Sequence, residues 1–261
     1  MIVAAFVSEW VKLRRRTLFA GTYGALAVLA ALFTTLVFAR ASNAGGGERF
    51  VSLTELAQPN GLVHGLNRAA ILLGIVAFGV AAAQIAGEYG LGTLRQLLVR
   101  QPRRSVLLLG KYLAVLTFLA GAVLAASLAG GVAAVIMAHV RGISTSAWFS
   151  STGLADMGRA VGDIALAVAG YATLGFVVGI VVRSSVVAII IGFVYLLPFE
   201  NIFAAVVNHS DRWLPGQLLT SVAQGGNSSA HYGDALTTVA VYLFIAGALA
   251  VARFSRADVT A

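Results

Sequence analysis

The sequence contains no cysteine, only four prolines and few charged residues. Without cysteine, the chain can form neither a disulfide nor a thiolate metal site. Charged residues make up 11% of its 261 positions, whereas a soluble domain carries about a quarter. Hydrophobic residues make up 59%. These proportions exclude an ordinary soluble enzyme and predict a protein of the lipid bilayer.

Six long apolar runs fill most of the chain. A helix needs roughly 20 residues to cross about 30 Å of hydrocarbon, and each run is close to or above that length. None shows the roughly ten-residue alternating segments of a membrane β-barrel. We therefore predict an all-α polytopic membrane protein with a single transmembrane domain over residues 1–261. Its spans are expected at about 18–39, 69–88, 111–138, 162–182, 184–207 and 234–253.

The positive charges, which give a net charge of +8, lie between the apolar runs. Membrane topology explains this distribution, so nucleic acid is not an expected partner. One set of helix ends holds twice as many Lys and Arg residues as the other, with clusters at 12–16 and 95–111. Because cytoplasmic loops carry the excess of cations, we expect both termini in the cytoplasm.

Residues 2–17 predict an amphipathic helix ahead of the first span. Such a helix lies in the membrane interface, with its tryptophan among headgroups and its cations toward lipid phosphate. A positively charged anchor for the first span is the simpler alternative. The residues expected to matter are Phe6 and Trp10 on the apolar face, and Glu9, Lys12, Arg15 and Arg16 on the polar face.

The segment 88–111, EYGLGTLRQLLVRQPRRSVLLLGK, gathers five cations, with Glu88 as its only acid. Its leucines predict the apolar stripe of a short helix, which Pro102 would end. One face of that helix would meet the bilayer or the other helices, and the other face a cytoplasmic partner. An ordinary basic loop is the alternative. The side chains expected to meet the partner are Glu88, Tyr89, Thr93, Arg95, Gln96, Arg100, Arg103 and Arg104.

Two stretches of the sequence resemble a known family. Glu88-x3-Gly92-Thr93-Leu94-Arg95, then Pro102-Arg103-Arg104 and Leu109-Gly110-Lys111, resembles the first cytoplasmic loop of ABC-2 type transporter permeases. The stretch EWVKLRRRT at 9–17 resembles the amphipathic lead-in helix of that family. The number of spans and the position of both ends agree with this resemblance.

The resemblance implies a multi-pass subunit of an exporter in the bacterial inner membrane. Two such subunits, either two copies of this chain or this chain and a sister permease, would enclose the export pathway. A separate ABC ATP-binding subunit, which binds ATP and Mg²⁺, would drive export through the lead-in helix and the 88–111 loop.

One acid, Glu200, interrupts an apolar run, where it follows Pro198 in the stretch LLPFEN. It would lie about 24 Å along its span, near the outer surface. The proline frees backbone groups that Glu200 and Asn201 can help to satisfy. We interpret Pro198, Glu200 and Asn201 as an outer gate, with a structural cap as the alternative, and 208–234 as a re-entrant hairpin. The four scattered histidines lack ligand spacing, so no metal site is expected.

Two other classes of function are less favoured. An ion-coupled secondary transporter would carry acids near the midplane and repeated halves, whereas the acids here are peripheral and no repeat is visible. A polytopic membrane enzyme would need a nucleophile and a base at one depth, and neither G-x-S-x-G nor H-E-x-x-H occurs. The sequence favours a transport subunit without catalytic residues, and it does not indicate the substrate.

The nearest approach to a phosphate-binding loop is Gly110-Lys111, but Ser105 replaces the required glycine and Tyr112 the required Ser or Thr. We therefore expect the purified chain alone neither to bind nor to hydrolyse ATP. Calorimetry and phosphate release measure the two properties. Nucleotide binding by a preparation free of other ATPases would contradict this prediction.

Overall fold

The computed structural model describes residues 2–42, 51–90, 104–227 and 230–256. Within these ranges the fold is all-helical and contains no strand. The helices are α1 (Ile2–Leu13), α2 (Arg16–Arg40), α3 (Leu53–Leu56), α4 (His64–Gly90), α6 (Arg104–Arg141), α7 (Ser151–Val182), α8 (Ser185–Val194), α9 (Glu200–Val206), α10 (Pro215–Ala223) and α11 (Tyr232–Arg256). Short 3-10 turns lie at Pro59–Val63, Ser146–Phe149 and Ser210–Arg212, and the π-helical turn η3 (Tyr195–Phe199) joins α8 to α9.

Among the described residues, six helical stretches are long and apolar enough to cross a membrane, which confirms the expected number. They are α2, α4, α6, α7, α11 and the continuous stretch from α8 to α9. Three of them start at least five residues earlier than expected: α4 begins at His64 instead of 69, α6 at Arg104 instead of 111 and α7 at Ser151 instead of 162. The helices therefore extend beyond their apolar runs.

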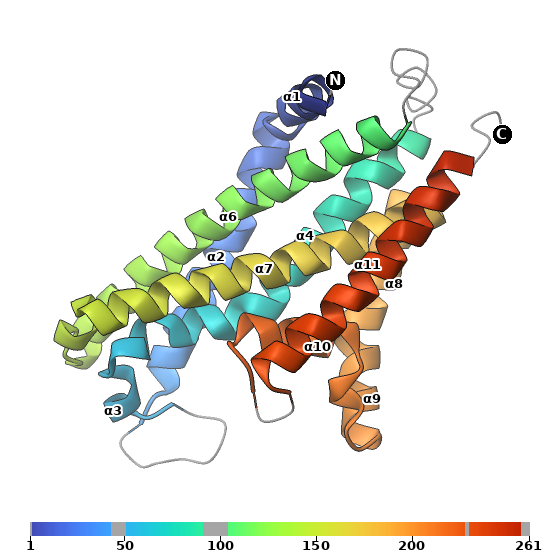
Figure 1. Cartoon of the computed structure of the whole chain (residues 1–261). Coiled ribbons are helices and arrows are strands. Elements are labelled where there is room, and N and C mark those ends of the chain that lie inside the picture. Colours follow the sequence, from blue (N-terminus) through green and yellow to red (C-terminus); the bar gives the residue numbers. More distant parts are fainter. Residues whose placement is uncertain (1, 43–50, 91–103, 228–229, 257–261) are drawn as a thin grey trace.

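The start of α1 and the end of α11 lie at the same end of the bundle (Figure 1). We call this end the terminal face. It also holds the end of α4, the start of α6 and the junction between α7 and α8. The other end, which carries α3 and the end of α9, is called the distal face.

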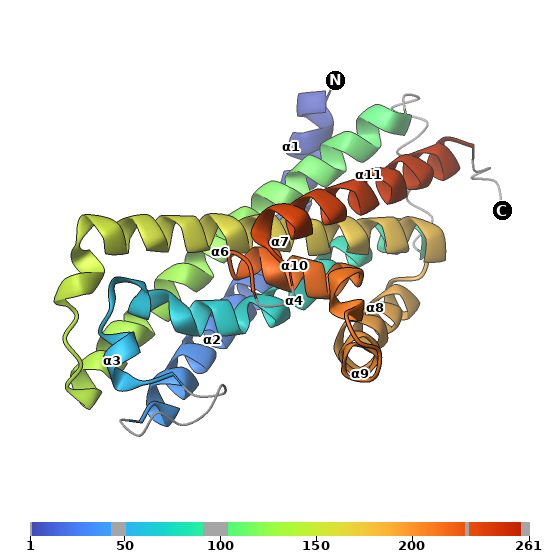
Figure 2. The same cartoon turned by 60° about the horizontal axis from the view of Figure 1, so that its bottom comes forward.

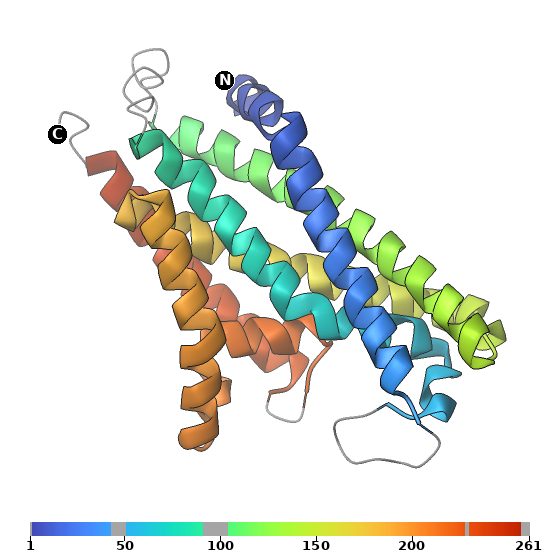
Figure 3. The ribbon, with the colours of Figure 1, turned by 180° about the vertical axis from the view of Figure 1, so that it is seen from behind.

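The two helices at the centre of the bundle are α4 and α7. They are the most buried of the spanning helices, and α11 is the least buried. Seen from behind, α4 lies between α2 and α8 (Figure 3). The short helix α10 packs against both α7 and α11 (Figure 2). It lies within the predicted re-entrant segment 208–234, and its burial explains why that segment mixes polar and apolar residues.

Glycines allow α4 to approach its neighbours closely. A Cβ at Gly175 of α7 would collide with the backbone of Phe78, and one at Gly192 of α8 would collide with the Phe78 ring. A Cβ at Gly74 of α4 would collide with the ring of Tyr171. Small residues permit such contacts between membrane helices, where apolar burial alone gives little driving force.

The residues that α8 and α9 bury follow an unusual spacing. Ala188, Gly192, Leu196 and Glu200 are all buried and lie four residues apart. In a regular α-helix, such a row drifts around the axis by about 40° at each step. The wider π-helical turn η3, which contains Pro198, reduces this drift. The turn thus keeps Glu200 on the same face as Ala188.

The contact at Gly175 generates a stability prediction. Gly175→Ala should lower the free energy of unfolding by about 1–3 kcal/mol, because the Phe78 backbone must move. Gly162→Ala, on the same helix, should leave it unchanged or raise it slightly, because that position has open space and alanine favours helix. Thermal unfolding in detergent measures both changes. Equal stability of the two variants would show that the α4–α7 contact is more compliant than this packing implies.

Candidate functional site

Lys111 is buried at the terminal face between two carboxylates. Only 1% of the surface of this residue is exposed. Its Nζ lies 2.5 Å from Oε2 of Glu9 and 2.8 Å from Oε1 of Glu88. Both acids are buried as well. A buried ammonium is stable only when it is paired in this way, because the loss of hydration is very costly.

Lys12 completes a ring of ion pairs. Its Nζ lies 2.7 Å from Oε1 of Glu9 and 2.9 Å from Oε1 of Glu88. Each lysine therefore contacts both acids, and the four formal charges cancel. We call Glu9, Lys12, Glu88 and Lys111 the ion cluster. The buried Oε2 of Glu88 accepts no hydrogen bond from the described residues, which do not include 91–103.

The ion cluster joins three helices that are far apart in the sequence. Glu9 and Lys12 are neighbours on α1, Glu88 stands near the end of α4, and Lys111 lies in the first turns of α6. Gly110 permits the contact, since a Cβ there would lie 2.5 Å from Cβ of Ala5 on α1. The cluster thus ties α1 to both helices that flank segment 91–103.

Burial and pairing act in opposite directions on the two α1 residues. Burial alone would raise the pKa of Glu9, but Lys111 and Lys12 outweigh it and hold this pKa below its ordinary value of 4.5. Burial would likewise lower the pKa of Lys12, but its hydrogen bonds to Glu9 and Glu88 outweigh it and raise this pKa above 10.5. Both residues are therefore charged at neutral pH.

Of the residues 2–17 predicted as one interfacial helix, Ile2–Leu13 form α1, and Arg16 already begins α2. Two side chains of α1 have contacts that differ from the expectation. Glu9, expected on the polar face, points into the protein because its partner Lys111 is buried there. Trp10, expected among headgroups, packs edge-on against Phe118 of α6 at a centroid distance of 6.5 Å. Phe6 stacks on Trp10 at 5.9 Å. Arg15 and Arg16 are exposed, as expected of the polar face.

Only the ends of the predicted coupling segment are described. Glu88 and Tyr89 belong to the last turns of α4. The guanidinium carbon of Arg183 lies 5.3 Å from the centre of the Tyr89 ring, and Phe254 of α11 contacts that ring edge-on. Arg104 opens α6. The remaining predicted residues lie outside the described ranges, namely Thr93, Arg95, Gln96, Arg100 and Arg103.

At the distal face, Glu200 caps the N-terminus of α10. Its Oε1 and Oε2 accept hydrogen bonds from the backbone N–H groups of Gly216 and Gln217, each at 3.0 Å. A carboxylate is favoured there because the free N–H groups and the helix dipole are positive. The hydroxyl of Tyr171 donates to the carbonyl of Gly216 at 2.9 Å. Glu200 thus makes the contacts of a structural cap, the alternative interpretation of this residue.

The other two residues of the predicted outer gate support this cap. Pro198 lies inside the π-helical turn. Nδ2 of Asn201 donates to the carbonyl of Leu197 at 2.6 Å, and its Oδ1 accepts from Nε2 of Gln217 at 3.4 Å. A gating movement of these residues stays a prediction.

Sequence reasoning named Lys111 as a cation but did not place it in the site. A signal was present, since the chain has only two lysines and both belong to the ion cluster. A lysine within the apolar stretch LLLGKYL requires a buried partner. Within the described ranges, no three His, Asp or Glu residues lie close enough together to hold a metal ion.

Residues 27–260 match a family described as a protein of unknown function, DUF2705. The matched region includes Glu88, Lys111 and Glu200, and it starts after α1. No protein with a curated description matches the sequence.

Removal of Lys111 should invert the pH dependence of stability. In the wild type, the lowered pKa of Glu9 stabilises the fold above about pH 4.5, and this contribution is lost as the pH falls through the folded pKa. The raised pKa of Lys12 adds stability that is lost above pH 10.5. In Lys111→Met, two buried carboxylates share one ammonium, so the fold should take up a proton on acidification.

We expect Lys111→Met to lose about 3–5 kcal/mol of unfolding free energy at pH 7 and to regain part of it near pH 5. The wild type should show no such gain. Arg14→Met, which removes an exposed cation from the same region, serves as the control. Thermal unfolding in detergent across this pH range measures the effect. Identical curves for the two variants would contradict a stabilising ion cluster.

Proposed function

We propose that this chain, which belongs to the DUF2705 family of proteins of unknown function, is the membrane-spanning subunit of an ATP-driven exporter. Its terminal face lies in the cytoplasm of a bacterial cell, and the distal face lies outside. ATP and Mg²⁺ bind to a separate ABC ATP-binding subunit. The transport path forms between two permease subunits, which are two copies of this chain or this chain and a sister chain.

The observation that carries the proposal is the ion cluster. Its members come from α1, α4 and α6, and the last two of these helices are the ones that flank segment 91–103 in the sequence. A push on that segment by a cytoplasmic partner acts on the ends of α4 and α6, and the cluster passes it to α1. Three of these four charged groups are buried, which makes the connection stiff, because separating any pair leaves an unpaired charge.

The cluster also suggests why its charges were retained in so apolar a chain. An apolar contact of similar volume is often as stable as a buried ion pair. Ion pairs, however, fix direction and distance, which apolar contacts do not. Transmission of movement between three helices requires such fixed geometry, whereas plain anchoring of α1 in the membrane requires only surface cations.

At the distal face, polar contacts also join separate helices. α10 is hydrogen-bonded to α9 through Glu200 and to α7 through Tyr171. In the proposed cycle, a shift of α6 and α7 at the terminal face moves α10 and opens the path outward. Pro198, Glu200 and Asn201 would act there as the gate.

A coupling measurement tests the proposal. The chain is co-expressed with the ABC ATP-binding protein that this proposal expects to be encoded beside its gene, and the purified complex is placed in nanodiscs. We expect ATP hydrolysis that depends on the chain. Glu9→Gln should reduce this stimulation by about 5- to 150-fold, the range that corresponds to ordinary coupling free energies. The exchange Glu9→Lys with Lys111→Glu, which keeps two acids and two lysines, should restore part of it.

Cysteine cross-linking provides the control, because the natural chain has no cysteine. Gln96→Cys should form cross-links with the ATP-binding subunit. Ser144→Cys, exposed near the far end of α6, should form none. Cross-linking of both positions or of neither, or ATP turnover equal with and without the chain, would overturn the proposal.

A further inference from the structure

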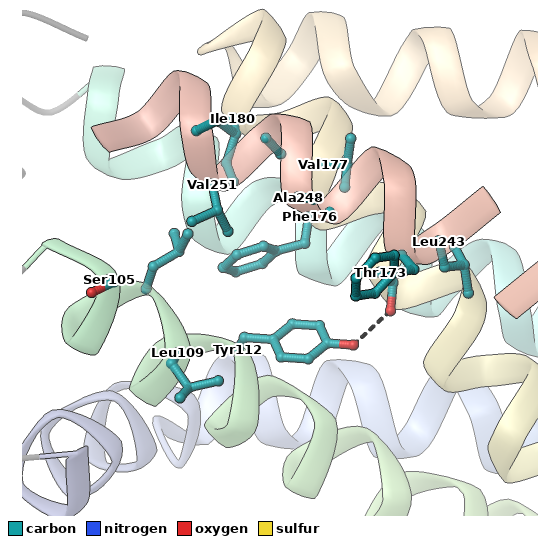
Figure 4. Close-up of a pocket in the computed structure, with 15 residues that line it drawn as sticks. Ser105, Leu109, Tyr112, Thr173, Phe176, Val177, Ile180, Leu243, Ala248 and Val251 are labelled. Carbon is teal, nitrogen blue, oxygen red and sulfur yellow. Dashed lines mark hydrogen bonds between the residues drawn. The ribbon is translucent and has the colours of Figure 1, made fainter. Parts of the chain in front are cut away.

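An apolar groove of about 590 Å³ opens on the bundle between α6, α7 and α11 (Figure 4). α6 contributes Leu109 and Tyr112, α7 contributes Phe176 and Ile180, and α11 contributes Val251 among others. The volume lies within the range of pockets that hold small ligands. The groove is separate from the ion cluster, none of whose residues lines it.

The groove exists because α11 presents small residues to its neighbours. Gly247, Ala248, Ala250 and Ala252 line it on this helix. Side chains of this size leave the space between α11 and α6 unfilled. An empty apolar groove loses the dispersion contacts of its walls, so a chain-like apolar ligand gains energy by entering it.

The length of the groove along α11 is close to the depth of one leaflet. Its lining on α11 runs from Leu243 to Ala252, a distance of about 14 Å at 1.5 Å per residue. Half of the hydrocarbon thickness of a bilayer is about 15 Å. At the deep end, the hydroxyls of Tyr112 and Thr173 bond to each other at 2.7 Å, so they leave an apolar lining. The shape fits one extended acyl chain.

Positive charge flanks the shallow end. The exposed Arg253 follows the lining residue Ala252 on α11. It belongs to the end of α11, which lies at the terminal face. A surface cation attracts an anionic headgroup. An acyl chain in the groove would place its headgroup near this residue.

We propose that this groove is a binding site for one acyl chain of an anionic phospholipid, taken from the leaflet next to the terminal face. The bound lipid fills the space between α6 and α11 and joins the loosely packed α11 to the bundle. The site requires only that the six helices span a bilayer. It does not depend on the exporter proposed above.

Photo-labelling tests the site. The full chain is placed in nanodiscs of equal parts phosphatidylcholine and phosphatidylglycerol, with a trace of either lipid that carries a diazirine on its acyl chain. Labelled peptides are mapped by mass spectrometry. We expect the phosphatidylglycerol tracer to label Leu109, Phe176 or Val251 about fivefold more than the phosphatidylcholine tracer, the factor expected of one surface cation. Ile245 and Leu249, exposed on α11 outside the groove, should be labelled equally by both.

Variants separate the groove from its surroundings. Ala248→Trp fills the groove and should abolish the preferential labelling, whereas Ala240→Trp, at an exposed α11 position outside it, should not. Leu109→Trp fills the groove from α6 and gives a second variant if the first is poorly folded. Arg253→Gln should keep acyl labelling but lower the preference for phosphatidylglycerol.

Labelling of the groove that equals labelling of Leu249 would mean that only ordinary boundary lipid is present, and the proposal would be wrong. The same conclusion follows if both groove-filling variants are labelled like the wild type. Since neither readout involves ATP, failure of this proposal leaves the proposed transport function untouched, and the reverse also holds.

Discussion

The pairing of Lys111 with two carboxylates constrains the terminal half of this molecule. An ammonium without water needs counter-charges within hydrogen-bonding distance, and the chain supplies them from α1 and α4. The position of α1 follows from this need. Its glutamate must reach Lys111, so the helix turns that side inward, and Gly110 must stay small to let it approach. One buried charge therefore joins three helices.

Buried charges are compensated in different ways at the two ends of the bundle. At the terminal face, charges from distant helices neutralise one another, and the connection is strong only while every member is present. At the distal face, Glu200 is matched by backbone N–H groups at a helix end. Backbone groups cannot be lost by side-chain substitution, so the distal contact depends mainly on Glu200 and on the small size of Gly216.

Much of the fold could be predicted from the length and composition of the apolar runs. The six apolar runs gave the number of long helices, since length and composition alone decide which segments can cross a bilayer. The helix ends were harder to predict, because a helix continues past its apolar run into polar residues. α7 starts at Ser151, where the hydroxyl of Ser150 accepts a hydrogen bond from Gly153 N–H. Serine is a preferred N-cap residue, so this helix start is one that a sequence can indicate.

The candidate site was predicted only in part. Glu9, Lys12 and Glu88 were named, but the amphipathic pattern of residues 2–17 placed Glu9 on the polar face. Such a pattern contains information about one helix alone, whereas Lys111 lies 102 positions away in the sequence. Glu200 was named too, but its partners are backbone groups of Gly216 and Gln217, whose position no side-chain pattern reveals.

The π-helical turn between α8 and α9 has a consequence for which sequence changes this chain tolerates. Most substitutions of exposed apolar residues on this helix change only its contacts with lipid. Loss of one residue within Tyr195–Phe199 would convert the wide turn into regular α-helix. Ala188 and Glu200 would then be about eleven residues apart, which at 100° per residue leaves them within about 20° of the same face. Loss of one residue between Ala188 and the turn, with the turn kept, would instead rotate Glu200 by about 100° and face it away from α10. This helix should therefore tolerate a change of length only at its wide turn.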